Sequence, residues 1–200
     1  DDTRFGENGV LFFADCGVIP DPSAEQLAEI ACSTGHLAKH LLGVEPRIAM
    51  LSYSTHGSAR HESVIKVKKA TELAMARSRE IGLQAQFDGE IQVDAALVPD
   101  VAALKDLKSH VAGRANVLIF PDLNAGNIAS KLLKHIARAN AYGQILLGID
   151  RPAADVSRGS NAHDVLGVAA IVGLQSIEYE ALFPGAGQVL PGDTLSLIHI

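Results

Sequence analysis

The chain lacks several features that mark particular classes of protein. It has no tryptophan, aromatic residues make up only 4% of it, and it holds two cysteines in 200 residues. Two cysteines exclude a disulfide-stapled scaffold and any Cys-rich metal site. The sequence also lacks a secretory signal pattern and an apolar run of the roughly 20 residues that a membrane-spanning helix needs. We therefore expect a cytoplasmic protein that has no membrane partner.

Excess positive charge and the common nucleotide-binding motifs are missing as well. Lys and Arg number 17 against 23 Asp and Glu, which gives a formal net charge of -6. This balance, without any basic run, argues against nucleic acid as a partner. No Gly-x-Gly-x-x-Gly fingerprint and no phosphate-loop lysine is present, so nicotinamide dinucleotides and Walker-type sites are disfavoured. We expect neither a bound cofactor nor a metal ion.

Aliphatic strand and helix patterns are what the chain has in abundance. Hydrophobic residues make up 48% of it, and short apolar runs alternate with longer stretches of helical spacing. This alternation predicts an α/β fold with right-handed crossovers and a mostly parallel five-stranded sheet, with helices on both faces. The predicted strands are residues 10–14, 47–52, 84–88, 116–120 and 144–149.

Helix boundaries follow from capping signals at the ends of the apolar patterns. Asp21 and Pro22 are predicted to start the first helix, because Asp caps well and Pro is tolerated at the first helical position, and Gly43 is predicted to end it. Further helices are expected over 62–81, in short pieces within 95–108, after the loop 122–127, and over about 162–173.

Polar loops follow the predicted strands, and in parallel sheets ligands bind outside the carboxyl ends of strands. After the second strand, Ser54, Thr55 and Ser58 surround Gly57, just before a helix. Their hydroxyl and backbone N–H groups can hold a phosphate. The competing interpretation is a plain Ser/Thr helix cap, which is the better reading of this loop taken by itself.

Two other strand ends carry candidate ligand residues. Asp122, Asn124 and Asn127 follow the fourth strand, where they either orient a polar ligand or cap the next helix. Cys16 follows the first strand and is either a reactive thiol or a small buried hydrophobe, and we favour the second interpretation.

The stretch 150–164 joins the fifth strand to the last helix and holds the densest set of chemical groups. Ser157 supplies a hydroxyl, Arg158 a guanidinium and Asp164 a carboxylate, beside a helix N-terminus that favours anions. The plain alternative is a loop in which Asp164 complements the helix dipole and Arg158 is solvated.

Six blocks of the sequence match one known family in order and spacing. They are residues 13–16, 51–58, 88–92, 111–117, 120–127 and 157–159. Over roughly residues 6–175 the chain thus resembles the phosphate acetyltransferase (phosphotransacetylase) family. The resemblance implies reversible transfer of an acetyl group between acetyl phosphate and coenzyme A, with inorganic phosphate as the other partner. It also implies two α/β domains with the active site between them, in a homodimer.

Roles for individual residues follow from the same resemblance. Ser157 would contact the coenzyme A thiol, Arg158 would hold phosphate or the developing negative charge, and Asp164 would be the general base. The thiolate would attack acetyl phosphate directly, without an acyl-enzyme. An ordinary Asp with a pKa near 3.9 is a weak base for a thiol near 8.5, so one of the two pKa values must move. The remaining substrate-binding candidates are Ser54, Thr55, Ser58, Asp122, Asn124, Asn127 and Cys16.

Two related readings stay open. One is the acetyl-CoA-sensing, acetyltransferase-like C-terminal region of malic enzymes, which generally lacks the Ser-Arg-Gly block and the downstream Asp that this chain has. The other is a phosphate butyryltransferase, whose corresponding loops read differently.

The resemblance also suggests how the chain divides. Residues 1–151 would be the second domain of the family, similar to that of isocitrate and isopropylmalate dehydrogenases. Residues 152–176 would return to an otherwise missing first domain, so the fragment alone is expected to be nearly inactive. Residues 177–200 form an atypical tail, for which a non-native terminus is one hypothesis.

Overall fold

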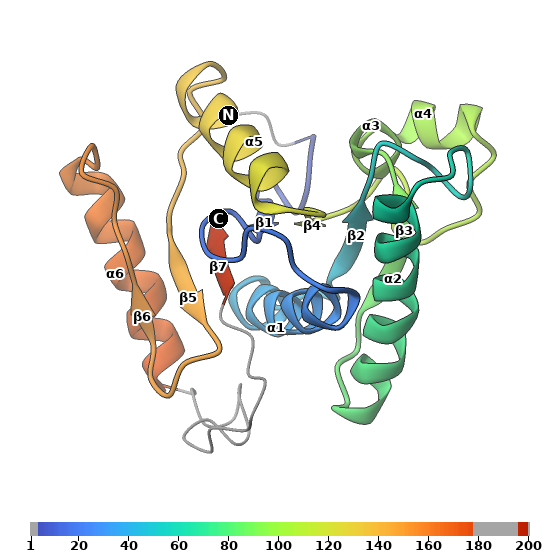
Figure 1. The fold of residues 1–200 in the computed structure, drawn as a ribbon. Helices are drawn as coiled ribbons and strands as arrows, with labels where there is room; N and C mark the ends of the chain where they lie inside the picture. The colour runs from blue at the N-terminus through green and yellow to red at the C-terminus, as the bar shows by residue number, and fades with distance from the viewer. Residues whose placement is uncertain (1–3, 178–195, 200) are drawn as a thin grey trace.

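The computed structural model describes residues 4–177 and 196–199 of the chain. Its strands form one sheet in the order β3-β2-β4-β1-β7-β5-β6 (Figure 1). The strands are β1 (Phe12–Ala14), β2 (Arg47–Leu51), β3 (Gln86–Ile91), β4 (Val117–Ile119), β5 (Ile145–Leu147), β6 (Ala153–Ala154) and β7 (Ser196–His199). The helices are α1 (Ala24–Leu42), α2 (Glu62–Glu80), α3 (Val93–Leu97), α4 (Pro99–Leu104), α5 (Leu123–His135) and α6 (Ala162–Ile177).

The first four strands pair in parallel, as the sequence predicts. β4 lies between β1 and β2, and Val117 is in register with both Phe12 and Ile48. β3 extends the sheet as a parallel neighbour of β2. The α/β class and the mostly parallel sheet are therefore confirmed.

The predicted count of five strands is wrong, because the described residues form seven. β6 is a two-residue strand antiparallel to β5, in a stretch predicted as loop. β7 comes from the tail and pairs antiparallel with both β1 and β5, so β5 does not pair with β1 directly. β7 escaped prediction because pairing between distant segments leaves no periodic signal in the sequence. β6 escaped prediction because two residues are too short for an alternating pattern.

Helices cover both faces of the sheet, as expected. One hydrophobic core joins α1, α2 and part of α6 to one face, and a second joins α3, α4 and the start of α5 to the other. Figure 1 shows α1 below and α5 above the central strands β1 and β4. α1 and α2 thus bury their apolar stripes against the sheet, whereas Ile128 and Leu132 on α5 are exposed.

The first helix begins later than predicted. Ser23, and not Asp21, is the N-cap of α1: its Oγ accepts the N–H of Gln26 at 3.2 Å, and Gln26 Oε1 accepts the N–H of Ser23 at 2.9 Å. This capping box satisfies two backbone donors that Asp21 would leave open. The helix ends at Gly43, with a positive φ of 67°, as predicted.

α5 begins inside the stretch predicted as a loop. Asp122 is its N-cap and accepts the N–H of Ala125 at 3.0 Å, so residues 123–127 form its first turns. A Cβ on Gly126 would lie 2.1 Å from the backbone oxygen of Asp15. Only glycine therefore allows α5 to approach the loop after β1 this closely.

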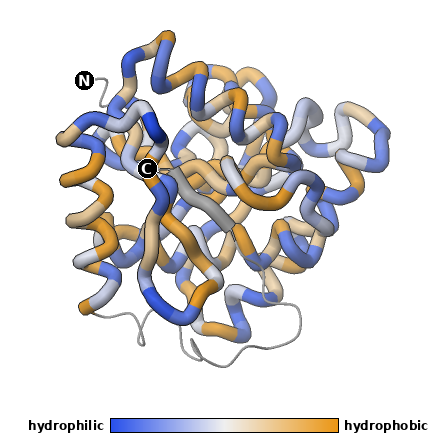
Figure 2. The backbone as a smooth tube through the Cα atoms, turned by 60° about the vertical axis from the view of Figure 1, so that its left-hand side comes forward, coloured by the Kyte–Doolittle hydropathy of each residue, from blue (hydrophilic) through white to orange (hydrophobic). Residues whose placement is uncertain are grey.

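α6 lies at one edge of the molecule, at the left in Figure 1, and Figure 2 shows hydrophobic residues along its length. Val168 is buried, and Ile171 packs against the core shared with β5, whereas Val165 and Leu166 are exposed. Part of the segment 152–176 thus packs on the same core as the rest. Of the predicted tail, residues 178–195 and 200 lie outside the described residues. None of the described helices is long and apolar enough to cross a membrane.

Candidate functional site

The loop between β2 and α2 is organised around a buried carboxylate from β3. Glu90 is only 2% exposed, and its Oε1 accepts the hydroxyl of Ser54 at 3.0 Å and the backbone N–H of Gly57 at 2.5 Å. Ser58 Oγ accepts the N–H of Thr55 at 3.0 Å. The donors that the sequence offered to a phosphate are therefore already used. The Glu90 side chain thus occupies the centre of the hydrogen bonds of this loop.

Further contacts from β3 and its end hold the same loop. Thr55 Oγ1 donates to Gln92 Oε1 at 3.1 Å, and Gln92 also accepts Lys105 Nζ at 2.6 Å. His56 Nε2 lies 2.8 Å from Asp88 Oδ1. The sequence leaves the role of Glu90 unassigned, because the third strand is predicted to end at Asp88 and Glu90 then falls in a loop, whereas β3 runs to Ile91.

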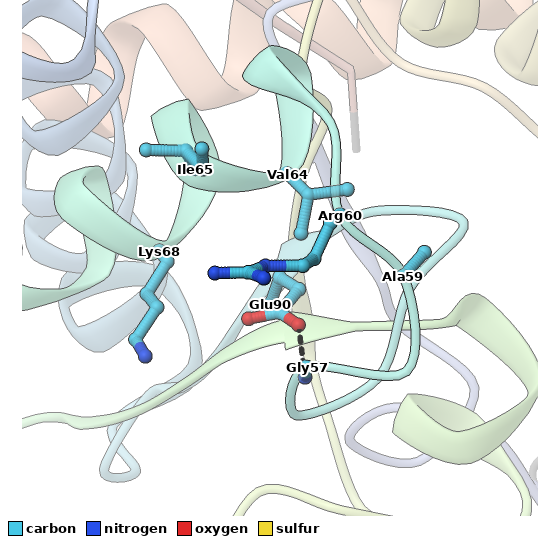
Figure 3. Close-up of a pocket in the computed structure, with 7 residues that line it drawn as sticks. All are labelled: Gly57, Ala59, Arg60, Val64, Ile65, Lys68 and Glu90. Carbon is cyan, nitrogen blue, oxygen red and sulfur yellow. Dashed lines mark hydrogen bonds between the residues drawn. The ribbon is translucent and has the colours of Figure 1, made fainter.

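A pocket of about 310 Å³ lies beside this loop. Figure 3 shows the Arg60 side chain passing over Glu90, with the Lys68 ammonium group to one side. The pocket is therefore lined by two basic side chains and one buried carboxyl group. A phosphate site built from backbone N–H groups would hold no such carboxyl group. Its lining residues are Gly57, Ala59, Arg60, Val64, Ile65, Lys68 and Glu90.

The loop after β1 is held by a second buried carboxylate. Asp15 Oδ1 accepts the N–H groups of Gly17 at 2.7 Å and Val18 at 3.1 Å, and Oδ2 accepts that of Ile19 at 2.8 Å. Asn127 on α5 donates its amide to the backbone oxygen of Cys16 at 3.0 Å. These hydrogen bonds join the loop to the sheet and to α5.

Cys16 is fully buried in this loop. Burial, with a further contribution from the neighbouring Asp15 carboxylate, raises the pKa of its thiol to about 12. A thiol in that state is protonated at neutral pH and is a poor nucleophile. The geometry thus favours the small buried hydrophobe that the sequence analysis preferred.

The three polar candidates at the start of α5, Asp122, Asn124 and Asn127, differ in their hydrogen bonds. Asp122 caps the helix, and Asn127 holds the β1 loop. The Asn124 side chain is exposed and forms no hydrogen bond within the described part of the chain, so its amide is the one of the three that remains available to a ligand.

The candidate residues in and after the loop before α6 differ in their exposure to solvent. Ser157 and Arg158 are exposed, whereas Asp164 is buried and its Oδ2 lies 3.1 Å from Lys134 Nζ on α5. The Lys134 ammonium group, as hydrogen-bond donor, lowers the pKa of the Asp164 carboxyl. Asn161 caps α6 by accepting the N–H of Asp164 at 2.9 Å.

The nominated residues do not gather in one place. Figure 1 shows α6 and the loop before it on one side of the molecule, and the β2–α2 loop on the other. Asp164 therefore lies near α5 but far from Ser54. No group of three or more His, Cys, Asp or Glu in the described ranges is arranged to bind a metal ion.

The chain is similar to known proteins over most of its length. A sequence model described as phosphate acetyl/butaryl transferase matches residues 4–173. The chain is 55% identical over 173 residues to a phosphate acetyltransferase from Thermoanaerobacterium thermosaccharolyticum, covering 86% of this chain and 52% of that protein. The chain thus spans about half the length of the curated relatives it matches.

Solved structures show the same likeness. A EutD phosphotransacetylase from Staphylococcus aureus superposes with a TM-score of 0.76 and 37% identity, covering 86% of this chain and 56% of that one. A phosphotransacetylase from Streptococcus pyogenes gives a TM-score of 0.71 and 40% identity, covering 84% of this chain and 53% of that one.

Proposed function

This chain belongs to the phosphate acetyl/butaryl transferase family, and from this we propose that the whole protein moves an acetyl group reversibly between acetyl phosphate and coenzyme A. The observation that carries the proposal is the match over residues 4–173, which includes Ser157, Arg158 and Asp164 in the expected order. The relatives named phosphate acetyltransferase support acetyl as the transferred group.

In the proposed reaction, Asp164 accepts the proton of the coenzyme A thiol while Ser157 orients the sulfur. The thiolate attacks the carbonyl carbon of acetyl phosphate, a C–S bond forms, and the C–O bond to phosphate breaks. Arg158 holds the departing phosphate by charge-assisted hydrogen bonds. Because the pKa of Asp164 is lowered, the proton transfer requires a more acidic thiol, and Arg158 with the N-terminus of α6 supplies that stabilisation.

We further propose that the site is completed by parts of the protein beyond this chain and that the whole protein is a homodimer. The chain covers about half of its relatives, and its nominated residues lie in separate groups. Residues 1–151 would then form one domain, and residues 152–176 would contribute to a second. Of the candidates Ser54, Thr55, Ser58, Asp122, Asn124, Asn127 and Cys16, we propose that Asn124 contacts substrate, because its side chain is exposed. The others hold the loops in shape, and Cys16 is fully buried.

The test uses the whole protein and follows the thioester absorbance of acetyl-CoA with and without inorganic phosphate. We expect phosphate-dependent loss of the thioester, and a fall in kcat of about 10²–10⁴-fold in Asp164→Asn, with little change in coenzyme A binding. An unchanged kcat in that variant would remove the general-base role. Acetyl-CoA binding without turnover would instead indicate a regulatory module, and preference for butyryl-CoA a butyryltransferase.

A further inference from the structure

One ion pair joins α5 to the proposed base on α6. Lys134 Nζ lies 3.1 Å from Asp164 Oδ2, and the two side chains are 31% and 11% exposed. Because the Asp164 carboxylate is largely withdrawn from water, this pair is screened less than an exposed one. The contact therefore differs from an ordinary surface salt bridge.

Few other groups act on the Asp164 carboxylate. Its Oδ2 also accepts the backbone N–H of Asn161 at 3.4 Å, and the imidazole of His163, the preceding residue on α6, lies near enough to favour the ionised form. Among the described residues, Lys134 is the cation that forms an ion pair with Asp164. The charge that faces the carboxylate from outside its own helix thus comes from α5.

We propose that Lys134 is a positioning residue for the proposed acetyl transfer: its ammonium group keeps the Asp164 carboxylate ionised and fixes its orientation at the start of α6. The inference rests on the proposed function, in which Asp164 takes the thiol proton. Lys134 touches neither substrate nor reacting atoms in this role, and it acts only through Asp164.

A shift in the pH dependence follows from this arrangement. Removing the ammonium group removes the largest influence that favours the charged carboxylate, so the pKa of Asp164 rises. A base must be ionised to accept a proton, so the acid limb of the kcat profile moves to higher pH. The freed carboxylate also loses its fixed direction, which lowers kcat on the plateau.

The experiment compares Lys134→Met and Lys134→Arg in the whole protein, with Lys69→Met as the matched control. Lys69 also forms a cross-helix ion pair, with Glu25, so its loss reports what breaking such a pair does by itself. We expect the acid limb of kcat to move up in Lys134→Met, to stay near its original place in Lys134→Arg, and to stay unchanged in Lys69→Met.

A second measurement does not depend on turnover. Titration of ¹³C-carboxyl-labelled aspartates by NMR, with the Asp164 signal identified by its loss in Asp164→Asn, gives the pKa of Asp164 directly. We expect it to rise in Lys134→Met only. If Asp164→Asn abolishes turnover while Lys134→Met changes neither the acid limb nor this titration, the inference is overturned and the proposed function stands. If Asp164→Asn is fully active, the inference and the general-base role of Asp164 both fail, and the proposed acetyl transfer itself stands.

Discussion

Two buried carboxylates hold the loops at the strand ends of this chain in shape. Asp15 and Glu90 are 3% and 2% exposed, and each accepts backbone N–H groups of the loop beside it. Hydrogen bonds to charged acceptors are strong, and leaving such donors unpaired is costly. Both residues therefore fix the shape of their loops. The hydroxyl groups of Ser54 and Ser58 form hydrogen bonds within the loop and are not free to bind a ligand.

At the residue scale, the cysteines are expected to be unreactive. Burial raises the pKa of the Cys16 and Cys32 thiols to about 12 each. We predict that a disulfide-exchange reagent at pH 8 titrates no thiol of the folded chain and two after unfolding in urea. Cys16→Ala should leave acetyl transfer by the whole protein within about threefold of the original, because a buried thiol adds packing and no chemistry. A fast-reacting thiol in the folded chain would contradict this.

At the element scale, ion pairs join α2 to α1 and to Asp21, which lies just before α1. The Lys69 ammonium group, as hydrogen-bond donor, lowers the pKa of the exposed Glu25 carboxyl to about 2. A lowered carboxyl pKa contributes stability that is present above its unfolded value of 4.5 and is lost as the pH falls toward 2. Exposed pairs of this kind contribute little each. The pairs are Lys66–Asp21, Lys69–Glu25 and Arg77–Glu29.

The packing of α5 against the loop after β1 depends on Gly126, which has no side chain. We predict that Gly126→Ala lowers the free energy of unfolding by about 1–3 kcal/mol, because the new Cβ overlaps the backbone oxygen of Asp15. Urea denaturation of the chain measures this. Gly173→Ala in α6 is the matched control, since nothing lies within 4 Å of its Cβ position and Ala favours helix by about 1 kcal/mol. Equal effects of the two substitutions would contradict the packing argument.

At the scale of the whole molecule, two helices leave apolar surface uncovered. Leu166 and Leu174 on α6 are 70% and 51% exposed, and Ile128, Leu132 and Ile136 form an exposed stripe along α5 and its C-cap. Exposed apolar side chains that gather on one face favour contact with another molecule.

The 200-residue chain by itself should therefore associate. We predict that its average mass, measured by light scattering after gel filtration, rises with concentration, and that Leu166→Glu combined with Leu174→Glu reduces the rise. Leu104→Glu on α4 serves as the control, because Leu104 is 87% exposed and lies away from α6. A chain that stays monomeric at every concentration would show that this surface is tolerated in water.

Local signals made much of the fold predictable. Aliphatic runs and helical spacing gave four parallel strands, the long helices and the end of α1 at Gly43, since these depend on residues close in sequence. The start of α1 was missed because Ser23 and Gln26 satisfy each other through a capping box. β7 was missed because its pairing joins segments far apart in the chain, and β6 because its two residues are too few to show a strand pattern.

The sequence by itself determined the family, the α/β class and the identity of the candidate residues, because these depend on residue order and spacing. Only the tertiary structure decided which groups are free. It placed Lys134 against Asp164 and Glu90 beneath the 54–58 loop, and it separated α6 from that loop across the sheet. Contacts between distant segments set burial, charge pairing and distance, and these physical quantities are not encoded in any single stretch of residues.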